Sequence, residues 1–493
     1  MFHYDAWLQT SPPLFLLLVR LTVLSLGATN WTLRLIPLLF GVLAAVLMFQ
    51  LARITLAPRF ARAAWALFVL SPLAISFSRT LKQFSAELAV STALLLTCCL
   101  YLQRGTDKRF RLLLATAAVG PLVAYSSAFL LPPVVLLVWL AGERPGPKTF
   151  APRGHRWRAP VLAAVWGGML LGVYVFCVRP NTSASLHAYW ADDRSAHNFA
   201  RNAVTDAYSL VYDLPVPRPV LHSTVVRAGV AIILLAGLAL SVLRYRHGRR
   251  KWLEIQALCG VPWFLLTVCS ALGLYPVNER MGLFLLPAVA LLLTCDSQLI
   301  AYFLLRGARR RRLVPVLDSG LAVLVALLLV VSAIRQPIHA AAVPLEDMSA
   351  AVSFLKGQFR EGDRLWVHAS GTETFKLYQH LDGWTNAPVQ SGHTGWPCCP
   401  RGVVVLKGSG READVRADIN TSLPSGFAGR VWLVYTTRPE HWSFVGIDES
   451  QVLDHVFVER GCVKGTTPVF YGIGVGLYDC GTGARDRPIV STH

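Results

Sequence analysis

Three charged residues stand between two strongly apolar runs of the sequence. Arg79, Lys82 and Glu87 lie in the segment 78–87, which separates the apolar runs 63–77 and 88–102. A charged side chain at membrane depth is costly, so it usually faces a polar cavity or lipid headgroups. Two cations could hold a phosphate group, and the carboxylate could orient one of them or contact sugar hydroxyls. The alternative is a plain turn at the membrane surface, with cations on headgroups and Glu87 in an ion pair.

The composition indicates a protein that crosses a membrane many times. Of 493 residues, 54% are hydrophobic and only 15% are charged, and the mean hydropathy is +0.47. A soluble protein of this length carries more charge, and several runs here reach the roughly 20 apolar residues that cross a bilayer. The net charge of +19 does not indicate nucleic-acid binding. Lys and Arg fall in short clusters between apolar runs, as expected for cytoplasmic loops.

The alternation of these clusters predicts the orientation of the spans. We expect the clusters within 53–62, 104–111, 144–158, 244–251 and 306–312 to be cytoplasmic. The expected fold is a polytopic α-helical bundle of about ten spans, at 34–52, 63–78, 86–103, 111–126, 128–141, 159–178, 224–243, 254–274, 281–302 and 314–334. The loops 78–87, 179–223 and 275–280, and everything after 334, then lie on the outer face.

The apolar run 13–26 is short for a span and contains Arg20. We interpret it as an amphipathic helix on the outer face; the alternative is a genuine short span. The first reading puts Met1 outside with no signal peptide ahead of it. It therefore predicts a further apolar helix upstream of Met1.

Several short motifs follow one another in a characteristic order. Gln9-Thr-Ser-Pro-Pro-Leu-Phe precedes Leu33-Arg34-Leu-Ile-Pro37, and Ser78-Arg79 precedes Lys82-Gln-Phe-Ser-Ala-Glu87. Leu274-Tyr-Pro276 and Arg280 come later. Over about residues 1–335, this order resembles the GT-C-type membrane glycosyltransferases, in the branch of protein mannosyltransferases and aminoarabinose transferases.

The resemblance implies an enzyme that moves a sugar from a polyprenyl-phosphate carrier to an acceptor on the outer face. The acceptor would be a glycan, a lipid or a protein, and no cofactor is implied. Cationic side chains hold the phosphate as charge develops on it. Arg79, Lys82 and Arg280 are the implied phosphate-binding residues, and Arg34 is a further substrate-binding candidate.

The sequence departs from the family at the general base, which is an Asp, often Asp-Glu, well ahead of the Pro-Pro element. Asp5 is the only acid before Pro12. Asp5 and Glu87 are therefore the catalytic candidates, although Asp5 could be a solvated loop residue. Two alternatives stay open: a transporter or flippase of lipid-linked saccharide, and an inactive relative acting as a partner subunit.

The loop 179–223 combines aromatic rings with carboxylates, which is typical of carbohydrate contact. The residues in question are Tyr189, Trp190, Asp192 and Asp193. The alternative is an aromatic belt at the membrane surface. His187 and His197 are too loosely spaced beside these acids to indicate a metal site.

After about residue 335 the composition changes to that of a small α/β domain, 336–493, which we expect to be extracytoplasmic. Helices are expected at 346–359 and 371–381 and a strand at 362–368, while 403–406, 430–435 and 452–459 could be strands or helices. Disulfides are permitted outside the cytoplasm, and we expect Cys462 to pair with Cys480. Cys398 and Cys399 leave other pairings open.

We expect a multi-pass protein of a bacterial inner membrane.

Overall fold

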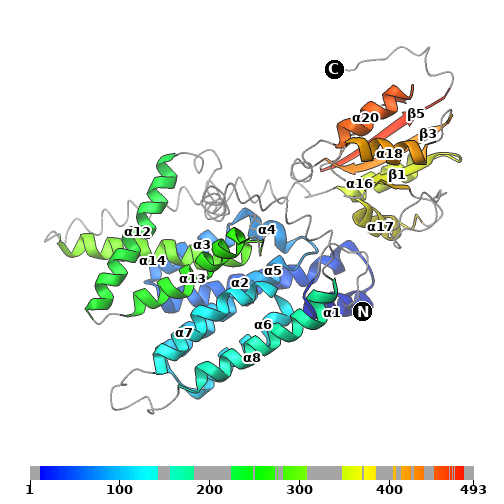
Figure 1. The fold of residues 1–493 in the computed structure, drawn as a ribbon. Coiled ribbons are helices and arrows are strands. Elements are labelled where there is room, and N and C mark those ends of the chain that lie inside the picture. Colours follow the sequence, from blue (N-terminus) through cyan, green and yellow to red (C-terminus); the bar gives the residue numbers. More distant parts are fainter. Residues whose placement is uncertain are drawn as a thin grey trace. The chain divides into compact units, whose positions relative to one another are not determined.

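The computed structural model describes residues 11–142, 156–181, 224–247, 250–272, 275, 281–307, 347–368, 371–384, 404–406, 412–423, 427–437, 449–465, 467–468, 470 and 472–481. The chain divides into two compact units, Met1–Ala342 and Val343–His493. The first is a bundle of helices and the second a mixed sheet with helices (Figure 1).

The first unit begins with helices α1 (Pro13–Leu26), α2 (Asn30–Thr55), α3 (Pro58–Val69), α4 (Pro72–Ser78), α5 (Phe84–Arg104) and α6 (Asp107–Val123). It continues with η1 (Tyr125–Leu130), α7 (Leu131–Gly142), α8 (Arg158–Val173), η2 (Tyr174–Val178) and η3 (Arg179–Asn181). The last elements described are α12 (Thr224–Arg246), α13 (Lys251–Ala271), η5 (Leu283–Leu285) and α14 (Leu286–Gly307).

Within the described residues, seven helices are long and apolar enough to cross a membrane, or eight if α3 and α4 form one span. The α3–α4 pair is bent by 53°. Pro72 causes the break, because a proline disfavours helical backbone at the residue before it and donates no hydrogen bond. The predicted span 111–126 corresponds to α6, which has 17 residues, and 314–334 lies outside the described residues.

Helix α5 forms the centre of this unit. It packs against α2, α4, α6 and η1, and 83% of its apolar window is buried inside the protein. Helix α2 is buried over only 28% of its window and exposes Leu39, Val42 and Val46. The exposed apolar surface of α2 suits contact with lipid, whereas α5 is surrounded by protein.

The second unit has a five-stranded sheet in the order β2-β1-β3-β5-β4. Its strands are β1 (Arg364–His368), β2 (Val404–Leu406), β3 (Arg430–Thr436), β4 (Val463–Lys464) and β5 (Ile473–Asp479). Strands β1, β2 and β3 run parallel, and β5 is antiparallel to both β3 and β4. The helices are α16 (Met348–Gln358), α17 (Thr372–Leu381), α18 (Glu412–Ser422) and α20 (Glu449–Glu459).

The sheet is covered on both faces. Trp432 and Val434 pack with residues of α16 and α17, while Val431 and Leu433 pack with residues of α18 and α20. This alternation follows the two-residue period of a strand, and it explains why the four central residues 431–434 of β3 are all apolar. Cys462 and Cys480 form the predicted disulfide. The undecided segment 452–459 is helical, within α20.

Candidate functional site

The cationic residues Arg79 and Lys82 lie in a short turn between α4 and α5, and both are half-buried. The Ser71 side chain caps α4 by accepting a hydrogen bond from the Ala74 amide at 3.4 Å. Thr80 Oγ1 donates to the Ser76 carbonyl at 2.9 Å, and the Lys82 amide donates to the Thr80 carbonyl at 2.7 Å. Local hydrogen bonds therefore fix the backbone that carries the two cations.

Helix α2 supports this turn through a close approach at Gly41. A Cβ atom at Gly41 would lie 2.7 Å from Ser78 Cβ, which is closer than real Cβ atoms come. The glycine therefore lets the end of α4 rest directly on the backbone of α2. Arg34 lies seven residues before Gly41, or about 10 Å along the helix axis, and is half-buried. It stands on α2 toward the end at which α5 begins.

Glu87 is in the first turn of α5 and is only 5% exposed. Its Oε2 atom has no hydrogen-bond partner among the described residues, and the carboxylate forms no ion pair there. Hydroxyl groups of Ser85 and Ser91 on α5, and of Ser126 and Ser127 on η1, are likewise buried without a partner. Buried polar atoms normally find partners. These unpartnered polar groups lie on α5 and η1, which pack together. They can therefore accept hydrogen bonds from a polar ligand and donate hydrogen bonds to it.

An aromatic wall adjoins this polar group. The rings of Phe129 and Tyr275 are 5.1 Å apart, and Phe129 stacks on Phe284 at 5.5 Å. Burial raises the pKa of the Tyr275 phenol well above its usual range, and the charge of nearby Glu87 raises it further. The neutral phenol and the carboxylate therefore belong to the same site, together with an apolar surface suited to the face of a sugar ring.

The segment ahead of α1 is also attached to this end of α5. Tyr125 Oη donates to the Ser11 carbonyl oxygen at 2.9 Å, and Ser11 Oγ donates to Gln83 Oε1 at 3.4 Å. The chain therefore enters α1 beside the turn that precedes α5.

The structure places Arg79 and Lys82 in the turn directly ahead of α5 and Glu87 in the first turn of that helix. It also places Ser126 and Tyr275 near Glu87, which sequence reasoning missed. The signal for Ser126 was available, since Tyr125-Ser126-Ser127 is a polar triplet between two apolar runs. Six other predicted residues lie outside the described part of the chain: Asp5, Tyr189, Trp190, Asp192, Asp193 and Arg280. Where the structure is described, no group of three His, Cys, Asp or Glu side chains could hold a metal ion.

Residues 10–169 match the sequence profile of the dolichyl-phosphate-mannose-protein mannosyltransferase family. The matched part contains α1 to α5 and the whole cationic turn. No curated protein sequence was found to match the chain.

Solved structures give the fold. The apo structure of ArnT from Cupriavidus metallidurans aligns with 13% identity and a TM-score of 0.50, covering 96% of this chain and 88% of that one. This protein has a GT-C-type fold. The same ArnT bound to undecaprenyl phosphate gives a TM-score of 0.47 at 11% identity, over the same shares of the two chains. The oligosaccharyltransferase of Archaeoglobus fulgidus, tethered to an acceptor peptide, gives 0.45 at 13% identity, covering 86% of this chain and 61% of that one.

Proposed function

We propose that this GT-C-type protein is a glycosyltransferase that moves a sugar from a polyprenyl-phosphate carrier to an acceptor hydroxyl. One observation carries the proposal: two cations stand in a fixed turn directly ahead of a buried carboxylate, at one end of a helix that is almost wholly enclosed by protein. The family whose profile matches residues 10–169 is named for a dolichyl-phosphate sugar, which supports a lipid-phosphate donor.

The reaction breaks the bond between the sugar C1 atom and a phosphate oxygen and forms a bond from C1 to the acceptor oxygen. Negative charge grows on the departing phosphate, where Arg79 and Lys82 stabilise it. Arg79 can form two parallel hydrogen bonds with phosphate oxygens, and Lys82 adds a compact charge. Arg280 is a further candidate for this role.

The remaining polar groups position the sugar and the acceptor. Glu87 accepts hydrogen bonds from sugar hydroxyls, and Ser126 and Tyr275 complete the subsite. The acceptor hydroxyl loses its proton to a general base, and Asp5 is the base that we propose. Arg34 and the aromatic and acidic residues of 179–223, Tyr189 to Asp193, are further sugar or acceptor contacts.

We place this site on the outer face of a bacterial inner membrane. The basic clusters 53–62 and 104–111 adjoin the opposite ends of α2 and α5, and such clusters mark the cytoplasmic side. The second unit would then be extracytoplasmic, where a disulfide is stable.

The test uses the full chain in proteoliposomes, a radiolabelled polyprenyl-phosphate sugar and native membranes as the source of acceptor. The quantity measured is the rate at which label leaves the carrier and joins an acceptor. We expect Arg79→Ala and Lys82→Ala each to lower this rate by about tenfold or more, because each removes a charge-assisted contact worth about 1.5–3 kcal/mol. Lys82→Arg should keep part of the activity. Arg62→Ala, an exposed residue at the other end of the bundle, is the matched control.

Wild-type rates in both alanine variants would disprove the phosphate assignment. Movement of intact labelled carrier across the bilayer, without a covalent product, would show a transporter instead. Carrier binding that requires Lys82 but leads to no product would show an inactive relative.

A further inference from the structure

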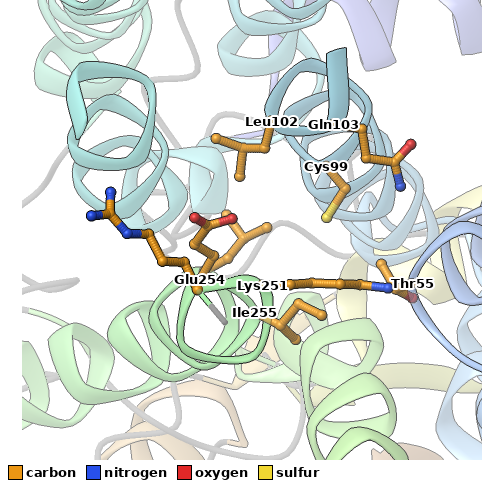
Figure 2. A pocket seen from close by; sticks show the side chains of 9 residues that line it. Thr55, Cys99, Leu102, Gln103, Lys251, Glu254 and Ile255 are labelled. Carbon is orange, nitrogen blue, oxygen red and sulfur yellow. The ribbon is translucent and has the colours of Figure 1, made fainter. Parts of the chain in front are cut away.

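A cavity of ≈ 280 Å³ lies at the other end of α5, between the ends of three helices (Figure 2). Its polar lining includes Thr55, the last residue of α2, Gln103, the last but one of α5, and Lys251, the first of α13. Helix α5 has 21 residues and is about 30 Å long. Cys99, the lining residue of α5 nearest to Glu87 in the sequence, follows it by twelve residues, or about 18 Å along the helix axis, so the cavity is separate from the Glu87 site.

The cavity is polar at the helix ends and apolar further in. Ile255 and Leu258 line its deeper part and are 4% and 1% exposed. They follow Lys251 by four and seven residues, or about 6 and 10 Å along the helix axis. Leu102 and Cys99 continue this apolar wall on α5. A polar mouth over an apolar wall at a helix end matches a phospholipid, with its headgroup above its acyl chains.

The polar lining carries charges of both signs. Arg250 and Lys251 are exposed cations, and Glu254 is a half-buried carboxylate one turn further along α13. In Figure 2 the Lys251 side chain extends across the cavity toward Thr55, and the Glu254 carboxylate faces the space between the helices. A phosphate alone would match the two cations, whereas a headgroup with a phosphate and an ammonium group would match all three charges.

The wall between α2 and α5 is already formed. Gln103 Nε2 donates to the Ile54 carbonyl oxygen at 3.1 Å, so the two helices are tied together beside the cavity. A ligand would thus bind to a preformed site, and ordering the site would cost little free energy.

We propose that this cavity binds the headgroup of an amine-bearing phospholipid such as phosphatidylethanolamine. The lipid phosphate lies between Arg250 and Lys251, and its ammonium group donates hydrogen bonds to the Glu254 carboxylate. The first part of an acyl chain covers Leu102, Ile255 and Leu258. Basic pockets between membrane helices are established sites for lipid phosphates, and the carboxylate adds selectivity for the amine.

The test is native mass spectrometry of the detergent-purified full chain, titrated with phosphatidylethanolamine, phosphatidylcholine and phosphatidylglycerol. We expect phosphatidylethanolamine to bind about tenfold more tightly than phosphatidylcholine, whose trimethylated amine cannot donate a hydrogen bond to Glu254. The double variant Arg250→Gln, Lys251→Gln should bind phosphatidylethanolamine at least about tenfold more weakly. Glu254→Gln should abolish the preference for phosphatidylethanolamine, so that the variant binds phosphatidylglycerol more tightly than phosphatidylethanolamine.

The matched control is Arg104→Gln, which removes one exposed cation at the same end of α5 without changing the cavity lining. It should leave all three affinities unchanged. Melting temperatures and donor turnover of every variant show whether it is folded. Equal affinities for the three lipids, or wild-type affinity in the folded double variant, would overturn the proposal. So would soluble phosphoethanolamine that displaces the lipid at equal concentration, because the acyl chain would then contribute nothing.

Discussion

Among the described residues of the helical unit, two acids are buried, Glu87 and Asp296, and their surroundings give them different roles. Asp296 on α14 accepts a hydrogen bond from Gln256 on α13 and lies against Gly237 of α12. It therefore joins three helices. Among the described residues, Glu87 Oε2 and Asp296 Oδ2 both lack a hydrogen-bond partner. Glu87 differs because buried serine hydroxyls of α5 and η1 surround it without partners of their own in the described structure. Such a group is better explained by a ligand than by folding.

We predict that Glu87→Gln keeps the fold and lowers the rate of sugar transfer by about tenfold or more, since hydrogen bonds to a charged acceptor contribute about 1.5–3 kcal/mol. Stability should be equal or higher, because a neutral amide costs less to bury than a carboxylate. Melting temperature and donor turnover measure the two effects. Asp296→Asn should show the opposite pattern, with lower stability and unchanged turnover per folded molecule. Full turnover in Glu87→Gln would remove this residue from the site.

Among the elements, α2 and α4 together determine where the cations stand. Pro72 ends the helical run of α3 and turns α4, and α4 ends on the backbone of α2 at Gly41. Their packing fixes the backbone of the turn that carries Arg79 and Lys82.

Gly41→Ala should therefore move the cationic turn. Its Cβ would lie 2.7 Å from Ser78 Cβ, and such overpacking costs about 1–3 kcal/mol. We expect turnover to fall together with stability. Adding Ser78→Gly removes the clashing atoms and should restore both, which a double-mutant cycle measures. Gly168→Ala, in α8 with no atom near its Cβ position, is the control and should stabilise the helix slightly. Additive effects of the Gly41 and Ser78 substitutions would contradict this account.

At the scale of the whole molecule, the two units have separate cores. The second unit places Phe375 and Trp432 on one face of its sheet and Phe457 and Tyr478 on the other. The Cys462–Cys480 disulfide joins the start of β4 to the end of β5, with a sequence separation of 18. This bond fixes a short edge strand that has few other contacts.

We predict that the double variant Cys462→Ser, Cys480→Ser lowers the unfolding free energy of the second unit by about 3 kcal/mol, the value expected for a loop of this length. Denaturation of the full chain, followed by tryptophan fluorescence with and without reductant, measures the change. Cys177→Ser, at a cysteine of the helical unit that forms no disulfide in the described structure, should leave the effect of reductant intact. A transition that reductant does not move in the wild-type chain would disprove the role of the bond.

Several features of this protein are local, and the sequence by itself determined them. Span positions follow from runs of apolar residues, and strand β1 from a short apolar segment beside a turn. The single unbroken helix implied by the predicted span 63–78 was wrong, because the chain bends at Pro72 between α3 and α4. The segment 430–435, left open between strand and helix, is strand β3. The same reasoning paired Cys462 with Cys480, and its placement of Arg79, Lys82 and Glu87 at one membrane surface stays a prediction. Strand β5 was missed, because Gly474 and Gly476 weaken a strand signal. In the fold, the ring of Tyr435 occupies the space that Gly474 leaves.

Only the tertiary structure decided which helices are enclosed and which groups meet. Helix α2 is more apolar than α5, with hydropathy 2.4 against 1.6, yet α5 is the one that is buried. Lipid is as apolar as a protein interior, so hydropathy does not distinguish the two surroundings. Hydropathy also says nothing about which segments lie next to one another. The sequence therefore could not show that Ser126 and Tyr275 lie near Glu87. Their positions depend on how η1 and the end of α13 pack around α5, and packing is a property of the assembled bundle.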